Sequence, residues 1–168
     1  LYSILFIIIL ISFFTFIIIN NAHEELQDKI NTLKEDYTNS QKELIKNDVN
    51  YTINFISYYN EKYKNTKSQE EIKKEVLQAL IPLRTSDNIN DYLFIYGENG
   101  TNIYNPIFKK SNAKQYLEIK DHEKEKIIKE LIDVSKKESG GYTEYFWYKI
   151  DIKKDIKKIS FSNSYSDW

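Results

Sequence analysis

The sequence of 168 residues contains no cysteine, which excludes disulfides, thiolate metal sites and a cysteine nucleophile. It also contains no methionine and begins with Leu1, so we expect it to be a fragment of a longer chain. Its 24 basic and 25 acidic residues nearly balance, and this charge favours no binding of nucleic acid. A chain of this length is expected to form one domain with a real core.

Arginine is scarce as well, because Arg84 is the one arginine among the 24 basic residues. A guanidinium group presents a planar fork that binds a carboxylate through two hydrogen bonds, which lysine cannot do. Arg84 is therefore a candidate anion-binding residue, and chance is the alternative explanation for its presence.

Motifs for catalysis and metal binding are also missing. There are four glycines, all at expected turns, and none forms a phosphate-binding loop. His23 and His122 have no second histidine at metal-ligand spacing, and Lys126 stands where a zinc-binding His-Glu-x-x-His motif needs histidine. We therefore expect no catalytic residue, no metal and no cofactor. Any enzymatic output region would lie C-terminal to this sequence.

The sequence begins with an apolar segment, residues 1–19, that contains no charged side chain. As a helix, nineteen residues at about 1.5 Å each span roughly 28 Å, close to the hydrocarbon thickness of a bilayer. A cleaved signal peptide is the alternative, but its apolar region is usually about 7 to 15 residues long. We therefore predict an uncleaved transmembrane helix over 1–19.

Residues 20–66 are predicted to form a long membrane-proximal signalling helix, since 21–64 contain neither proline nor glycine. Apolar residues recur at helical spacing, with a slip of about one position after Leu44; they are Leu26, Ile30, Leu33, Tyr37 and Leu44, then Val49, Ile53, Ile56, Tyr59 and Tyr63. We expect this stripe to meet a second copy of the chain. Packing against the chain's own domain is the alternative.

The third region, 67–168, is predicted to be an α+β domain. A capping box of Ser68 and Glu71 begins a helix that Pro82 stops, and a hairpin over 91–106 follows. A third helix is expected from near Asp121 to Gly140, then strands over 142–149 and 158–165 with a charged connection between them. Tight turns on either side of one helix favour an antiparallel sheet with helices on one face.

Aromatic residues share faces of the expected strands. Tyr92, Phe94 and Tyr96 alternate along one strand, and Tyr145, Trp147 and Lys149 alternate along another. An aromatic wall with a cation is what a pocket for a small organic anion requires, and Arg84 precedes the first strand. The alternative is that these aromatics are ordinary sheet core.

These motifs, in this order, resemble the single Cache domain. They are Arg84 in "LIPLR", the strand "DYLFIYGENGTNIYNP", the strand "GGYTEYFWYK" and the strand "KKISFSNSYSDW", and the resemblance covers roughly residues 20–168. Single Cache domains are PAS-like extracytoplasmic sensors of bacterial chemoreceptors, sensor histidine kinases and cyclic-di-GMP enzymes. The expected fold is therefore a PAS-like antiparallel sheet flanked by a long N-terminal helix that continues the transmembrane helix.

The resemblance implies a pocket for small carboxylates such as acetate, propionate, pyruvate or lactate. It assigns Arg84 as the carboxylate clamp and implies that the other pocket residues are Tyr92, Phe94, Asn105, Trp147, Lys149 and Ser160. Asn105 stands where the family usually has histidine, so the ligand preference is expected to differ. Phe161 stands where tyrosine is common and removes a hydroxyl.

The sequence therefore predicts a homodimeric sensor domain outside the bacterial cytoplasmic membrane, which binds a small organic anion and signals through the long helix. The partners expected are this ligand, the membrane and a second copy, and no nucleic acid. The alternative function is a membrane-anchored coiled-coil interaction protein whose sheet is purely structural.

Overall fold

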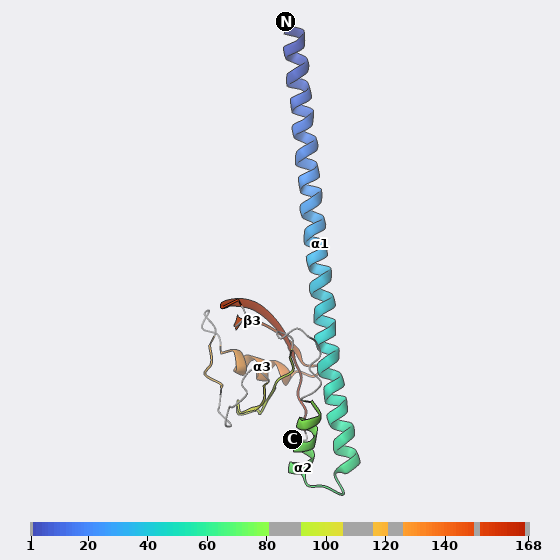
Figure 1. Cartoon of the computed structure of the whole chain (residues 1–168), viewed down its shortest axis with the longest axis vertical. Helices are drawn as coiled ribbons and strands as arrows, with labels where there is room; N and C mark the ends of the chain where they lie inside the picture. The colour runs from blue at the N-terminus through green and yellow to red at the C-terminus, as the bar shows by residue number, and fades with distance from the viewer. Residues whose placement is uncertain (1, 81–91, 106–115, 121–125, 150–151, 167–168) are drawn as a thin grey trace. The chain divides into compact units, whose positions relative to one another are not determined.

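The computed structural model describes residues 2–80, 92–105, 116–120, 126–149 and 152–166. Its elements are α1 (Tyr2–Tyr63), α2 (Gln69–Leu80), β1 (Ile95–Tyr96), β2 (Asn102–Tyr104), α3 (Ile127–Ser135), β3 (Gly141–Lys149) and β4 (Lys154–Ser162) (Figure 1). The α+β class and the long N-terminal helix are confirmed. The chain divides into two compact units, 1–41 and 42–168.

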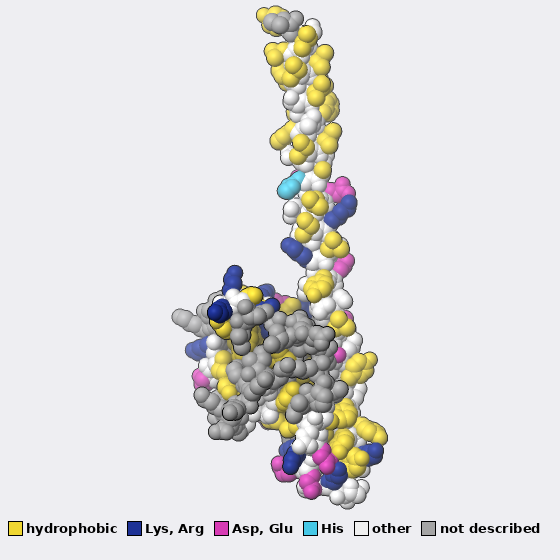
Figure 2. All heavy atoms as spheres, viewed as in Figure 1, with side chains coloured by type: hydrophobic (Ala, Val, Ile, Leu, Met, Phe, Trp, Pro, Cys, Tyr) yellow, Lys and Arg dark blue, Asp and Glu magenta, His cyan; other side chains and the backbone are white. Residues whose placement is uncertain are grey.

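The first unit consists of the N-terminal part of α1. Apolar side chains cover the surface of this helix before His23 (Figure 2), and those of Phe6, Ile9 and Phe16 are about 60% exposed. Within the described residues, α1 is the one helix long and apolar enough to cross a membrane, by length and composition.

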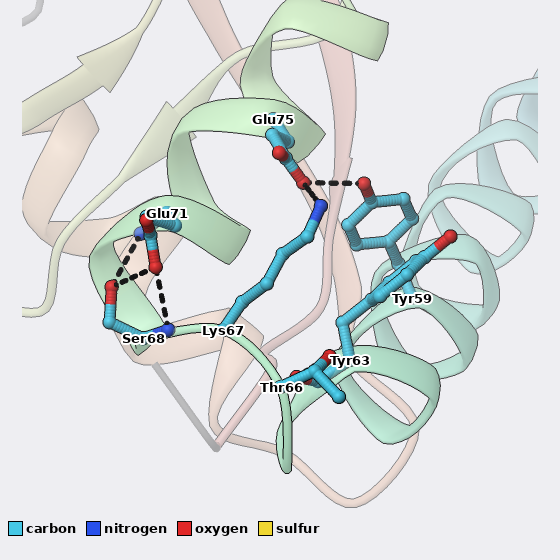
Figure 3. Close-up of polar contacts among 7 residues, drawn as sticks. All are labelled: Tyr59, Tyr63, Thr66, Lys67, Ser68, Glu71 and Glu75. Atoms are coloured by element: carbon cyan, nitrogen blue, oxygen red, sulfur yellow. Dashed lines mark hydrogen bonds and ion pairs between the residues drawn. The ribbon is translucent and has the colours of Figure 1, made fainter.

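In the second unit, α2 packs against the C-terminal end of α1. Ile56 of α1 forms a buried cluster with Ile72, Val76 and Leu80 of α2. The predicted capping box starts α2: the backbone N–H of Ser68 donates to Glu71, and the backbone N–H of Glu71 donates to the Ser68 hydroxyl (Figure 3). These bonds satisfy backbone donors that a helix start otherwise leaves without partners.

A polar cluster joins the same two helices (Figure 3). The hydroxyl of Tyr59 donates to Glu75 at 2.6 Å, and the Lys67 ammonium reaches the same carboxylate oxygen at 2.5 Å. Lys67 also lies 4.5 Å from the ring centre of Tyr63. The Lys67 ammonium and the Tyr59 hydroxyl lower the pKa of Glu75, so this carboxylate stays charged and links α2 to α1.

The predicted hairpin forms, with shorter strands than its sequence pattern suggests. β1 and β2 pair antiparallel, and the backbone N–H of Gly97 donates to the carbonyl of Thr101 across the turn. Gly100 has a φ of 78°, a conformation that favours glycine. The register shifts between Ile95 and Tyr96, and residues 92–94 belong to no strand.

The prediction that the third helix starts near Asp121 is wrong, because α3 begins at Ile127. Lys120 forms an isolated antiparallel bridge with Lys126, the residue directly before the helix. The early acidic residues of the sequence pattern therefore precede α3, and Glu130 is the acidic residue of its first turn. The helix also ends earlier than the expected Gly140, because its last residue is Ser135.

β3 and β4 form a nine-residue antiparallel ribbon, from Gly141 paired with Ser162 to Lys149 paired with Lys154. The prediction for β3 is confirmed. The prediction that β4 starts at 158 is wrong, because residues expected to form a charged connection belong to the strand. In this strand Ile156 lies opposite Trp147, and pairing with β3 supplies the backbone hydrogen bonds of these residues.

Helices lie on both faces of this ribbon, which corrects the expectation of helices on one face. Tyr145 and Trp147 pack with α3, in a cluster around Ile127, Ile128 and Leu131. On the opposite face, the Tyr142 hydroxyl donates to the backbone carbonyl of Lys42 in α1 at 2.9 Å. Because successive strand residues alternate between faces, one strand contacts both helices.

The apolar repeat of α1 is interrupted after Leu44, and the residues before and after this interruption lie on different faces of the helix. Residues of the second half of the stripe face their own domain: Ile56 is buried, and Tyr59 and Tyr63 pack beside it. Leu44 is 54% exposed, and the exposed residues that follow it at seven-residue spacing are Tyr51 and Tyr58. The alternative of packing against the chain's own domain is therefore correct for Ile56, Tyr59 and Tyr63, but Leu44 is not covered.

Candidate ligand-binding site

The candidate site is the face of the β3–β4 ribbon that packs with α3. On this face Thr143 lies opposite Ser160, and Tyr145 lies opposite Lys158. The hydroxyls of Tyr145 and Ser160 are 2.9 Å apart and share a buried hydrogen bond. A ribbon of this kind holds its side chains at fixed positions, because the ladder sets the spacing of each cross-strand pair.

A glycine allows α3 to approach this face. A β-carbon at Gly141 would lie 2.7 Å from a methyl carbon of Val134 in α3, so any larger residue would push the helix away from the ribbon. Gly140, which precedes it, has a φ of 68° and turns the chain from α3 into β3. This pair positions α3 beneath Tyr145.

Aromatic rings from three segments gather on the same side. Ring centres are 6.3 Å apart for Tyr92 and Phe94, 5.6 Å for Phe94 and Tyr96, and 6.3 Å for Tyr96 and Tyr116. Tyr145 and Trp147 meet edge to face at 6.0 Å. All except Tyr92 belong to or pack against the α3 cluster, so the rings form one aromatic layer. Such pairs favour edge-on or offset geometries.

Polar groups stand among these rings. The side-chain amide of Asn105 donates to the Tyr96 hydroxyl at 3.3 Å, and Asn105 is only 8% exposed. The ammonium of Lys158 lies 3.9 Å from the ring centre of Tyr92. The layer therefore offers an amide, a cation and the hydroxyl pair of Tyr145 and Ser160 within an apolar surface.

Burial changes the pKa values of the tyrosines in this layer. Burial raises the pKa of Tyr145 to about 12, although its hydrogen bond with Ser160 works in the opposite direction. Burial also raises the pKa values of Tyr92 and Tyr96. These hydroxyls are therefore neutral at physiological pH and can donate hydrogen bonds to an anion.

The structure brings together six of the eight predicted site residues, from four segments of the chain; they are Tyr92, Phe94, Asn105, Tyr145, Trp147 and Ser160. Lys149 lies on the same face at the end of β3, opposite Lys154. Arg84 lies outside the described residues, so its role stays a prediction.

Two further residues of the layer, Tyr116 and Lys158, were assigned no role from the sequence. The position of Lys158 could have been predicted, because it stands two residues before Ser160 in a strand and therefore lies on the same face. Tyr116 carried no such signal. It lies in an irregular segment, and its backbone N–H donates to the carbonyl of Gly100, which holds this segment beside the hairpin.

The opposite face of β3 contacts α1 through a charged cluster. Glu144 lies 3.5 Å from the ammonium of Lys42 and 2.6 Å from that of Lys157. Lys42 also lies 5.6 Å from the ring centre of Tyr142. The hydrogen bond from Lys157 is the main reason that the pKa of Glu144 lies below its usual value. The amide of Asn163 adds a hydrogen bond to Asn50 of α1 at 3.3 Å.

Within the described part of the chain, no three histidine or acidic side chains come close enough to hold a metal ion. The candidate chemistry is binding, through aromatic surface and a few polar groups.

The long helix and the two-faced antiparallel ribbon with an aromatic layer define a PAS-like sensor domain. The chain belongs to the Cache domain family, whose sequence model matches residues 18–168. Cache domains are sensory modules without catalysis, and they bind small-molecule ligands in receptors.

One similar protein is the sensor histidine kinase MctS of Rhizobium johnstonii. It is 27% identical over 143 residues, which are 84% of this chain and 30% of that kinase. The crystal structure of a methyl-accepting chemotaxis protein from Vibrio parahaemolyticus has a similar fold, with a TM-score of 0.66 over 80% of this chain and 86% of that one. Its identity of 19% makes this a likeness of fold alone.

Proposed function

We propose that this chain is the extracytoplasmic ligand-sensing domain of a bacterial transmembrane receptor and that it binds a small organic acid. The observation that carries the proposal is the aromatic layer on the α3 face of the β3–β4 ribbon, with Asn105, Ser160 and Lys158 among its rings. Small-ligand sites combine an apolar wall with a few polar groups that orient the ligand. A cation with neutral hydroxyl and amide donors is suited to a carboxylate.

The family resemblance adds Arg84 to this proposal as a bidentate clamp on the carboxylate. Asn105 is a neutral amide where histidine is usual, and its side chain already donates to Tyr96. An amide does not change charge between pH 5 and 8, as histidine can. Binding in this chain should therefore depend less on pH in that range than it would with histidine at position 105.

The membrane anchor is proposed as residues 1–19 of α1, followed by a membrane-proximal helix over 20–66 and the sensor domain over 67–168. Its support is the length of the apolar segment and the exposure of its side chains in the described chain. The receptor would lie in the cytoplasmic membrane. A kinase, chemoreceptor or cyclic-di-GMP region outside these 168 residues would supply the output.

The proposed route of the signal is from the aromatic layer through β3 to α1. Tyr145 faces the layer, while its neighbours Tyr142 and Glu144 contact Lys42 on the other side of the strand. A ligand that moves β3 would therefore change the contact with Lys42. Ligand binding would favour one of two positions of α1 relative to the ribbon.

The receptor is further proposed to be a homodimer. Tyr37, Leu44, Tyr51 and Tyr58 recur every seven residues, and each is more than half exposed. A seven-residue apolar repeat is typical of helices that pair. The same repeat also suits the alternative function, a coiled-coil interaction protein, but that alternative assigns no purpose to the polar groups of the aromatic layer.

Ligand binding tests the proposal most directly. Purified chain in detergent should unfold at a higher temperature with acetate, propionate, pyruvate or lactate, and not with the corresponding amides. A ligand at a hundred times its dissociation constant stabilises the folded state by about 2.7 kcal/mol. Calorimetry should then give the affinity of each acid.

A pair of variants locates the site. Trp147→Ala should abolish the stabilisation, because Trp147 belongs to the aromatic layer. Tyr148→Ala is the matched control, since this next residue points to the opposite face and is 54% exposed. The absence of stabilisation by every acid in the unsubstituted chain would contradict the proposal.

A further inference from the structure

Two buried hydroxyl groups of the ribbon have no hydrogen-bond partner within the part of the chain that the structure describes. They belong to Thr143 in β3 and Ser162 in β4. Thr143 is only 2% exposed, and Ser162 is 9% exposed. Burial of a hydroxyl without a partner is costly, because its hydrogen bonds to water are lost on folding. Native proteins rarely leave such groups unsatisfied, and a molecule bound at the site can supply the partner.

Thr143 lies on the ribbon face that carries the aromatic layer. It stands two residues before Tyr145, so both side chains project to the same side of the strand. It also pairs directly with Ser160 of β4, and the hydroxyls of Ser160 and Tyr145 are 2.9 Å apart. Directly opposite residues on one face have their β-carbons about 4.5 to 5.5 Å apart. The Thr143 hydroxyl therefore stands beside this hydroxyl pair.

Ser162 lies one cross-strand pair further from the rings, opposite Gly141. A β-carbon at Gly141 would lie 2.7 Å from a methyl carbon of Val134, so α3 packs closely against this end of the ribbon. Of the two hydroxyls, that of Thr143 is thus the one next to the polar groups of the aromatic layer.

The chemistry of this hydroxyl indicates what would bind it. A threonine hydroxyl both donates and accepts hydrogen bonds, so it can donate to a keto oxygen or pair with a ligand hydroxyl. An acid without a second oxygen would offer it only methyl or methylene groups. Sites with buried polar groups discriminate against analogues that lack the matching group, because those buried groups then have no partner.

We propose that Thr143 forms a hydrogen bond with a second oxygen of the ligand. The site would then prefer 2-hydroxy and 2-oxo acids to unsubstituted acids of the same length. The rings contact the carbon skeleton, and Thr143 takes the second oxygen beside Ser160 and Tyr145. This inference rests on the proposed function and deepens it, since it names the class of organic acid and a residue that selects it.

Calorimetric titration of the chain in detergent with propionate, lactate and pyruvate tests the inference, because the three acids share one carbon skeleton. The unsubstituted chain should bind lactate and pyruvate about 3- to 10-fold more tightly than propionate, the range expected for one neutral hydrogen bond. Thr143→Val exchanges the hydroxyl for a methyl group and should remove this preference. Its affinity for propionate should stay within about twofold.

Two further variants are the controls. Ser162→Ala removes the other buried hydroxyl and should keep the preference for lactate and pyruvate. Thr143→Ser retains a hydroxyl at position 143 and should keep it as well. Melting curves without ligand show whether the hydroxyl supports folding: since it has no partner among the described residues, Thr143→Val should melt no lower than the unsubstituted chain.

The outcomes are distinct. If the unsubstituted chain binds all three acids equally well, or if Thr143→Val keeps the preference, the inference is overturned and the proposed function stands. The same holds if Ser162→Ala loses the preference to the same extent, or if Thr143→Val melts clearly lower, because the hydroxyl would then serve the fold. If the unsubstituted chain binds no acid, both the proposed function and this inference are overturned.

Discussion

At the scale of single residues, the buried pair of Tyr145 and Ser160 links the core to the candidate site. Tyr145 is 6% exposed and belongs to the α3 cluster, while its hydroxyl meets Ser160 at 2.9 Å. A buried hydroxyl without a partner is costly, so each of these groups satisfies the other.

This pair predicts an alkaline dependence of stability. Because burial raises the pKa of Tyr145 to about 12 from its ordinary value of 10.0, the folded state resists ionisation. The stabilisation is fully present below pH 10 and is lost as the pH rises through about 12, with a slope of at most about 1.4 kcal/mol per pH unit.

Tyr145→Phe removes this titration, so its free energy of unfolding should fall less steeply above pH 10 than that of the unsubstituted chain. At neutral pH the variant should be about 1 kcal/mol less stable, because Ser160 loses its partner. Urea unfolding at a series of pH values measures both effects. Tyr148→Phe, at an exposed position, is the control. Equal slopes for Tyr145→Phe and the unsubstituted chain would refute the prediction.

At the scale of elements, β3 is the strand whose two faces have different partners. Its odd-numbered residues from Thr143 face the aromatic layer, and Tyr142 and Glu144 contact Lys42. The hydroxyl of Tyr142 donates to a main-chain carbonyl of α1, so this contact ties β3 to the helix backbone itself.

Removal of this contact should uncouple α1 from the ligand. The double variant Tyr142→Phe, Glu144→Gln keeps the ring that packs 5.0 Å from Phe161 but loses the bond to Lys42 and weakens the ion pair. It should bind acids with unchanged affinity. Hydrogen exchange of backbone amides in 43–50 should respond to ligand in the unsubstituted chain and respond much less in the variant.

Tyr148→Phe is the control for this experiment also, because it changes a hydroxyl on the same face at an exposed position. A ligand response in 43–50 that persists undiminished in the double variant would show that the signal takes another route. A response absent from the unsubstituted chain, despite measurable binding, would reject the route through α1.

The elements differ in how far the sequence could predict them. The start of α2 was predictable because the side chains of Ser68 and Glu71 each accept a hydrogen bond from the other's backbone N–H. The two residues are only three positions apart. The starts of α3 and β4 were not predictable, since each coincides with backbone pairing that the pattern of side chains does not encode. Lys126 bridges to Lys120, and Lys154 pairs with Lys149, so propensity and charge pattern alone pointed to other boundaries.

At the scale of the whole molecule, the exposed repeat on α1 is the proposed contact with a second copy. The chain has no cysteine, so a single introduced cysteine can pair only with its counterpart in another chain. Tyr51→Cys should therefore form a disulfide-linked dimer under mild oxidation in detergent. Gln78→Cys, at an exposed position on α2, should not.

Disruption of the repeat should weaken the dimer. Leu44→Lys should raise the dissociation constant at least about tenfold, because it places a charge in an apolar contact. Glu43→Lys introduces the same side chain about 100° away around the helix and should have little effect. Sedimentation in detergent measures both. A monomeric unsubstituted chain, or equal effects of the two variants, would reject the proposed interface.

The sequence by itself determined the apolar N-terminal segment, the long helix, the two-faced ribbon strand and the Cache domain resemblance, because these are written in local periodicity and in motifs. Only the tertiary structure decided which half of the α1 stripe is covered, which face of β3 joins the aromatic layer, and that Tyr116 and Lys158 belong to it. The reason is physical: periodicity says which residues share a face, but the identity of what packs on that face depends on segments far away in the chain.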